Sequence, residues 1–362
     1  MFLCLGSPVK AGEVVFTPED TGRAAAGESW DEFIDALPED AAEAADGIDP
    51  FDPAGSAEAV EKKAGWLGGR VREVFETAIT TVIPETAPLF AALLVAAAVK
   101  TAVPSPVMAE GFARILRLWS ACVVFRLTER AVALAKTITE TAAHLMELMV
   151  PVTEAIAIFD GSLTERQVAS AGMMLAVTLT GEVAAHLLVP LTGALAGLTA
   201  VHAGCGVLGS FTAGLRKALL RLWQFVTVCV SFLLGAQSVI AKSADSMAQR
   251  TAKFALSTFI PVAGSALAEA WSAVRTGAGF LRGAAGIGGI LALLGLLIPA
   301  IVPLVLYRLL FSLSSDAAEI LGLGEMHGML EGAAGILELL VAFVLYSAVM
   351  FFFALVLFAG IR

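Results

Sequence analysis

Charged residues are scarce in this sequence. Only 15% of its 362 residues are Asp, Glu, Lys or Arg, whereas an average soluble domain has about 25%. Hydrophobic residues make up 58% of the chain, and its mean hydropathy is +0.83. A globular enzyme with a water-exposed surface fits this composition poorly, so the sequence favours an integral membrane protein.

Cysteine is also rare, and its spacing gives no metal-ligand pattern. The four cysteines lie far apart, without a CxxC pair or a Cys-His cluster. We expect them to pack between helices as small hydrophobic residues: Cys4, Cys122, Cys205 and Cys229. The sequence shows no nucleophile paired with a base, no P-loop and no HExxH helix, so we expect neither an enzyme nor a cofactor or metal site.

Long uncharged runs are what the sequence has instead. Residues 339–360 and 283–307 are uncharged runs of 22 and 25 residues, and about 20 helical residues cross a hydrocarbon core of about 30 Å. Residues 222–241 form another clear span of 20 residues. Weaker candidate crossings lie at 86–103, 142–159, within 167–215 and, as a short re-entrant or tilted helix, at 254–267. The sequence therefore predicts an all-α polytopic membrane helical bundle of about seven spans, with a range of five to eight.

Acidic residues are concentrated near the amino terminus. Residues 12–61 contain 15 Asp or Glu and one basic residue, Arg23, which gives this stretch a net charge of −14. The whole chain carries −10, so the remaining residues carry +4. The acidity argues against nucleic acid as a partner. We predict that residues 12–84 form an acidic, partly helical extracytoplasmic region and residues 85–362 the transmembrane domain.

Local signals divide the amino-terminal region further. The sequence SWDE at residues 29–32 is typical of a capping box, and the short amphipathic helix it opens should end before Pro38. Residues 40–57 predict a linker with little to bury. Residues 58–82 predict a second amphipathic helix, which lies on a membrane surface or packs as an ordinary soluble helix. Residues 1–11 resemble the remnant of a signal peptide whose start lies upstream of Met1.

Glu182 and His186 form an unusual polar pair within an apolar stretch. They are four residues apart, so they share one face of a helix and can interact. Ionisable groups at membrane depth are costly and call for a reason. Two interpretations stay open: an interhelical hydrogen bond that fixes packing, and a proton relay or cation site of a stand-alone secondary transporter.

Pro261 and Gly264 interrupt a short apolar segment. Broken helices at membrane depth are tolerated where protein or water satisfies the freed backbone groups. This segment is either a kink buried in the bundle or part of a pore lining.

Glycines crowd the start of the 283–307 run. No strand precedes them, so a dinucleotide-binding loop is excluded, and small residues at this spacing let helix backbones approach closely in lipid. We expect close helix packing at Gly279, Gly283, Gly286, Gly288 and Gly289.

Several ordered segments resemble the stage III sporulation protein AE family. The most distinctive block runs from TFIPVAGSALAEA at residues 258–270 to GAAGIGG at residues 283–289. LMELMVP at residues 145–151 and IPAIVP at residues 298–303 also stand where that family would have them. The resemblance covers roughly residues 140–360.

This resemblance implies a biological role that the residues alone do not give. In that family an exported acidic region precedes a polytopic bundle in the mother-cell membrane around the forespore. The bundle is thought to join other stage III sporulation membrane proteins in a channel or secretion-like complex that supports forespore development. We therefore expect such proteins and the lipid bilayer as partners, together with a possible homo-oligomer, and no family catalytic residues to carry over.

Overall fold

A computed structural model describes residues 18–50, 53–103, 105–160, 163–183, 189–205, 211–232 and 264–359, together with residues 186 and 236. The described residues are almost entirely helical and contain no strand, which confirms the all-α prediction. The helices are α1 (Pro18–Asp35), α2 (Glu39–Ala45), α3 (Pro53–Ala102), α4 (Pro106–Asp160), α5 (Leu163–Val183), α6 (Val189–Cys205), α8 (Gly264–Ile320) and α9 (Gly324–Ala359). A further helix covers residues 211–232.

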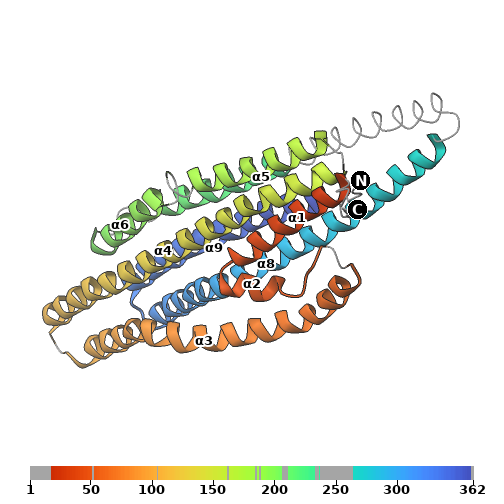
Figure 1. Cartoon of the computed structure of the whole chain (residues 1–362). Coiled ribbons are helices and arrows are strands. Elements are labelled where there is room, and N and C mark those ends of the chain that lie inside the picture. Colours follow the sequence, from red (N-terminus) through yellow and green to blue (C-terminus); the bar gives the residue numbers. More distant parts are fainter. Residues whose placement is uncertain are drawn as a thin grey trace, which may run out of the picture.

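Four long helices run side by side and give the molecule an elongated shape (Figure 1). α8 has 57 residues, which corresponds to about 85 Å at 1.5 Å per residue. It packs most extensively on α9, to which it is joined by a tight turn with Gly322 at a φ of +66°. A left-handed backbone conformation of this kind favours glycine after a helix. The α8–α9 pair is the centre on which the other helices lie.

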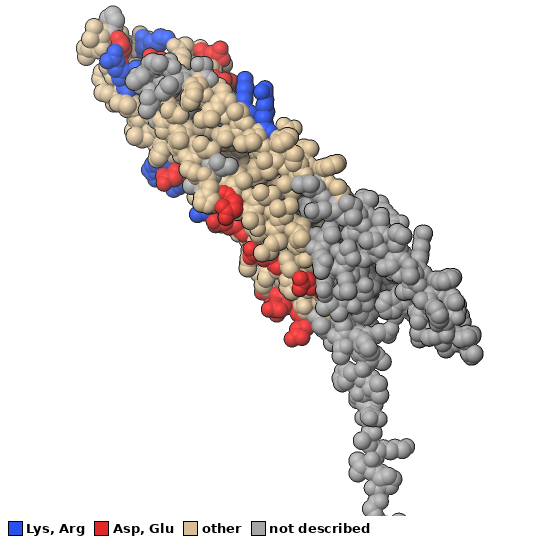
Figure 2. Space-filling model, turned by 90° about the horizontal axis from the view of Figure 1, so that it is seen from above, with Lys and Arg blue, Asp and Glu red and all other residues tan. Residues whose placement is uncertain are grey.

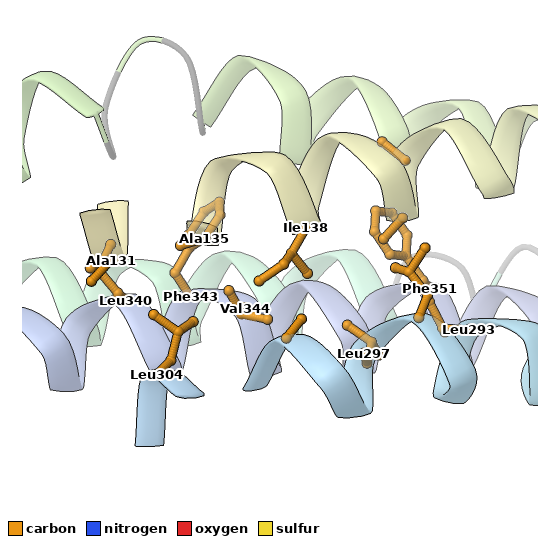
Figure 3. Packing of buried hydrophobic residues seen from close by; sticks show 14 of the residues in the cluster. Ala131, Ala135, Ile138, Leu293, Leu297, Leu304, Leu340, Phe343, Val344 and Phe351 are labelled. Carbon is orange, nitrogen blue, oxygen red and sulfur yellow. The ribbon is translucent and has the colours of Figure 1, made fainter. Parts of the chain in front are cut away.

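The core is built from leucine, alanine and aromatic side chains of α4, α8 and α9. Figure 3 shows this packing at close range. The labelled residues lie in one buried cluster: Ala131, Ala135 and Ile138 of α4, Leu293, Leu297 and Leu304 of α8, and Leu340, Phe343, Val344 and Phe351 of α9. The alanines of α4 let its backbone approach the larger side chains of the central pair.

α3 is longer than the sequence predicts. The amphipathic helix expected over residues 58–82 and the span expected over residues 86–103 form one continuous helix, despite Pro84 and Pro88. The expected domain boundary at residue 84 therefore falls inside it. Val82 and Leu89 are both buried in the core, so tertiary packing on each side of the prolines offsets their cost of about 3 kcal/mol.

The linker expected at residues 40–57 is wrong for its first part. Residues 39–45 form α2, and the alanines Ala41, Ala44 and Ala45 are buried against α8. α1 packs on α4. The small alanines suit a close approach to α8 at Gly295, where the Cβ of Ala44 comes within 2.6 Å of the position that a glycine Cβ would occupy. The acidic helices thus lie directly on the apolar ones.

Three described helices are long and apolar enough to cross a membrane. Their segments are Glu58–Ala102, Gly283–Ile320 and Gly324–Val356. Of the weaker candidates, residues 167–215 are divided between α5, α6 and the start of the 211–232 helix, and residues 142–159 belong to the single long helix α4. Most of residues 233–263 lie outside the described residues. The total of about seven spans stays a prediction.

Candidate functional site: a polar groove between three helices

A groove of about 550 Å³ lies between α3, α4 and α8. Its walls contain both polar and apolar side chains. The residues that α8 adds to the lining belong to its uncharged run. The lining residues are Arg70, Glu73, Val74, Thr77, Ala78, Thr81 and Val82 of α3, Arg130 and Leu134 of α4, and Pro299, Pro303 and Tyr307 of α8. Charged groups at both of its ends fix the helices around it.

A three-residue polar cluster joins the helices at one end of the groove. Glu85 of α3 accepts a hydrogen bond from Arg130 of α4 on one carboxylate oxygen and from the hydroxyl of Tyr307 of α8 on the other. Tyr307 is buried, whereas Glu85 and Arg130 are partly exposed. A carboxylate that receives donors from two helices fixes their relative position, because moving either helix breaks a hydrogen bond to the charged group.

A second charged cluster lies at the other end. Arg70 pairs with Glu73 at 2.9 Å on its own helix and with Asp40 of α2. Its Nε atom is buried and has no hydrogen-bond partner among the described residues. Arg70 therefore connects the amino-terminal helices to the groove, and its buried Nε–H is a hydrogen-bond donor that is not used.

Two prolines of α8 form the apolar wall. A proline within a helix removes the hydrogen bond to the carbonyl four residues earlier, so Pro299 and Pro303 leave the carbonyls of Gly295 and Pro299 without their usual helical partner. In a helix of this hydropathy such groups need protein or water beside them. The groove places polar side chains next to this part of α8.

The groove lies alongside the 25-residue uncharged run of α8. Tyr307, which contacts Glu85, is the last residue of that run. Near its other end, Gly289 lies against Met149 of α4: a Cβ on Gly289 would be 3.2 Å from the methionine methyl group. α4 from Arg130 to Met149 therefore runs beside α8 from Tyr307 back to Gly289, over about 27 Å.

The predicted pair Glu182 and His186 forms, but on the outer surface. The carboxylate of Glu182 and the Nε2 of His186 are 3.2 Å apart, and the two side chains are 66% and 76% exposed. Neither residue lines the groove. Both are far more exposed than an ion pair inside a bundle, and within the described part of the chain no other helix supplies them with a partner.

The other predicted positions have different environments. Pro261 lies outside the described residues, Gly264 is the first residue of α8, and Gly279 lies farther along the same helix. A Cβ on Gly283 would meet nothing within 4 Å, and Gly286 is buried. Among Gly283, Gly288 and Gly289, the latter two make close contacts: Gly288 lies against the Trp30 ring of α1, and Gly289 against Leu355 of α9 and Met149.

Sequence reasoning missed the groove residues. Glu85, Arg130 and Tyr307 are separated by up to 222 positions, so no local pattern joins them. One signal was available: Glu85 and Tyr307 each stand at the edge of an uncharged run, and Tyr307 is one of two tyrosines in the chain. Paired ionisable and hydroxyl groups at the ends of such runs are where interhelical contacts form.

Comparison with known proteins gives one match. The family model described as stage III sporulation protein AE matches residues 106–361, which include α4, α5, α6, α8 and α9. The matched range covers two walls of the groove and leaves out α1, α2 and α3. Searches among curated proteins and among solved structures found no match.

Proposed function

The chain belongs to the stage III sporulation protein AE family, and we propose that it is a non-enzymatic, multi-pass membrane subunit of a sporulation channel or secretion-like complex. This complex would connect the mother cell with the forespore and support forespore development. The subunit would lie in the mother-cell membrane around the forespore, with other stage III sporulation membrane proteins as its partners.

One observation carries this proposal beyond the family. A groove with charged and hydroxyl-bearing walls lies beside the uncharged run of a helix that is apolar enough to cross a membrane. Charged groups at such a depth have a high desolvation cost. Their presence therefore indicates a role in passage, coupling or assembly. A conduit or an assembly role accounts for charged and hydroxyl-bearing walls beside such a helix.

Affinity purification during sporulation tests the proposal. The tagged full chain, solubilised with a mild detergent from sporulating cells, should co-purify with other stage III sporulation membrane proteins. Deleting its coding region should block spore development and leave vegetative growth unchanged. Recovery of the chain alone, together with normal spores from the deletion strain, would refute the proposal.

The alternative is a stand-alone secondary transporter, and the contact between Glu182 and His186 is the observation in its favour. If that pair couples proton movement to a solute, the purified chain in proteoliposomes should take up solute when a proton gradient is imposed. Glu182→Gln and His186→Ala should each abolish the uptake. Normal spore development in both variants, with no uptake by the unaltered chain, would exclude the alternative.

A further inference from the structure

We infer that the outer face formed by α1, α2 and residues 130–149 of α4 lines a water-filled lumen at the depth of the bilayer, closed on its far side by other copies of this chain. We call this surface the charged face and define it by its exposed residues Asp31, Asp35, Lys136, Glu140, His144 and Glu147. The inference rests on the proposed function, because a conduit subunit must present some polar surface to the passing solute.

The first step is the register of α4 against α8. Met149 lies against Gly289, and Arg130 shares the carboxylate of Glu85 with Tyr307. Every α4 residue between 130 and 149 therefore lies beside the uncharged run of α8. If that run crosses a membrane, this part of α4 is at bilayer depth too.

The second step is the polarity of α4 over this stretch. Its side chains facing the core are apolar, such as Ile138, Ala142 and Met146, which are at most 5% exposed. Its exposed side chains recur at helical spacing and are polar, with exposures of 47–64% at Lys136, Glu140, His144 and Glu147. A charged group that faces lipid at the middle of a bilayer is energetically costly, so this stripe needs water or protein in front of it.

The amino-terminal helices extend the same face. Trp30 of α1 lies against Gly288, and Asp40 and Ala44 of α2 lie against Gly295, both within the uncharged run of α8. The outward side chains of α1 and α2 are acidic, including Asp31 and Asp35. Figure 2 shows acidic residues gathered along one long edge of the molecule, with a largely uncharged surface beside them.

The opposite side of the central helix pair has the reverse character. The helix over residues 211–232 is held against α9 by stacking of Trp223 on Phe343, with ring centroids 4.9 Å apart. Its outward side chains are large and apolar, with Phe225 and Phe232 at 65% and 72% exposure. Such an apolar surface is suited to contact with lipid. If it faces the bilayer, the charged face is turned away from the lipid.

Copies of this chain are the occupants that fit the far side. The stripe of α4 lies on the outer surface of a single chain, so one chain cannot enclose it. A closed rotational arrangement turns the same face of every copy toward one axis. Because the faces carry an excess of carboxylates, they repel at short range and keep water between them.

The test uses single cysteines in a background whose native cysteines are replaced, since Cys122 is exposed. Glu140→Cys places a thiol on the charged face, and the matched Phe225→Cys places one on the apolar face. The purified chain in liposomes is treated with a charged, membrane-impermeant methanethiosulfonate. We expect Glu140→Cys to react at least ten times faster than Phe225→Cys, and the conductance of the unmodified channel in planar bilayers to fall on modification at residue 140 only.

Each other outcome overturns the inference. Equal reaction at both positions would mean that this part of the bundle is outside the bilayer, and an unreactive Glu140→Cys would mean that lipid or protein covers the face. Rapid reaction at residue 140 without conductance, or a monomer by mass measurement in nanodiscs, would reject closure by copies of the chain. Co-purification with sporulation proteins can succeed in any of these cases, so the failure of the lumen is distinguishable from the failure of the proposed function.

Discussion

The two sides of the α8–α9 pair differ in what covers them. On one side lie α1, α2, α3 and residues 130–149 of α4. The outer faces of α1, α2 and this part of α4 are polar or charged, whereas α3 also exposes large apolar side chains such as Phe75 and Ile83. On the other side, α5 and α6 pack on α4 and α9, and the 211–232 helix, which stacks Trp223 on Phe343 of α9, exposes leucine and phenylalanine side chains. The comparison teaches that the hydropathy of a helix does not decide what surrounds it, since the same central helices contact both kinds of neighbour.

The two sides also use different contacts to reach α8. Toward α1 and α2, the contact positions are Gly288 and Gly295, seven residues apart and therefore on one face of the helix. Toward α9, the contact includes Gly289 against Leu355, within a wide area of leucine and phenylalanine packing. The charged side, by which we mean α1, α2 and the part of α4 beside them, is thus held by a few close contacts. Weakening these contacts should destabilise this side without destabilising the packing of α8 on α9.

Trp30→Ala should have the largest effect. Trp30 is 4% exposed, lies on Gly288, packs on Phe33 at 5.2 Å between ring centroids, and donates a hydrogen bond to the carbonyl of Ile48 at 3.2 Å. Removing a buried tryptophan costs about 3–5 kcal/mol. We expect α1 and α2 to lose their protection from amide hydrogen exchange by two to three orders of magnitude, while α9 stays protected.

Trp119→Ala is the matched control for this change. Trp119 lies on α4 and is 47% exposed, so its truncation should shift exchange in α1 and α2 very little. Equal protection in the two variants would show that Trp30 does not hold the charged side to α8. Loss of protection throughout the chain would show that the two sides unfold as one unit.

Gly295→Ala should have a smaller effect on the same contact. A Cβ at this position would be 2.5 Å from the carbonyl oxygen of Asp40 and 2.6 Å from the Cβ of Ala44, so the backbone of α2 must move. Overpacking of this kind costs about 1–3 kcal/mol. The measurement is the thermal unfolding midpoint in detergent, which we expect to fall.

Gly283→Ala on the same helix is its control. A Cβ there meets nothing within 4 Å, and alanine is favoured over glycine within a helix by about 1 kcal/mol. We expect the midpoint to rise or stay unchanged. If the two alanine variants shift the midpoint in the same direction, the close approach of α2 to α8 is not the reason that position 295 requires glycine.

The sequence predicts those features of the fold that depend on local composition and pattern. The uncharged runs at 283–307 and 339–360 lie in two helices that could cross a membrane, and Pro38 does separate two helices. The family resemblance over residues 140–360 is confirmed by the match over residues 106–361. In these cases a local pattern and the tertiary structure favour the same conformation.

The remaining features depend on contacts between distant residues. Residues 39–45 have no large apolar side chains, so their burial depends on the close approach that Gly295 of α8 allows. α3 continues through Pro84 and Pro88 because residues on both sides pack on the core. The groove could not be predicted either, because Glu85, Arg130 and Tyr307 come from three helices and meet only after folding.

Tyr307→Phe should have the smallest effect and sharpens the comparison at the groove. The change removes the hydroxyl that donates to Glu85 and keeps the ring, while Arg130 still pairs with the carboxylate. A hydrogen bond to a charged group contributes about 1.5–3 kcal/mol, and the remaining Arg130 contact should keep the loss near the lower value.

Tyr346→Phe on α9 is the control, since no hydrogen bond of its hydroxyl is found in the described part of the chain. We expect the unfolding midpoint to fall for Tyr307→Phe and not for Tyr346→Phe. An equal shift would mean that the hydroxyl of Tyr307 does not hold α3 to α8, and the charged side would then depend on the glycine contacts alone.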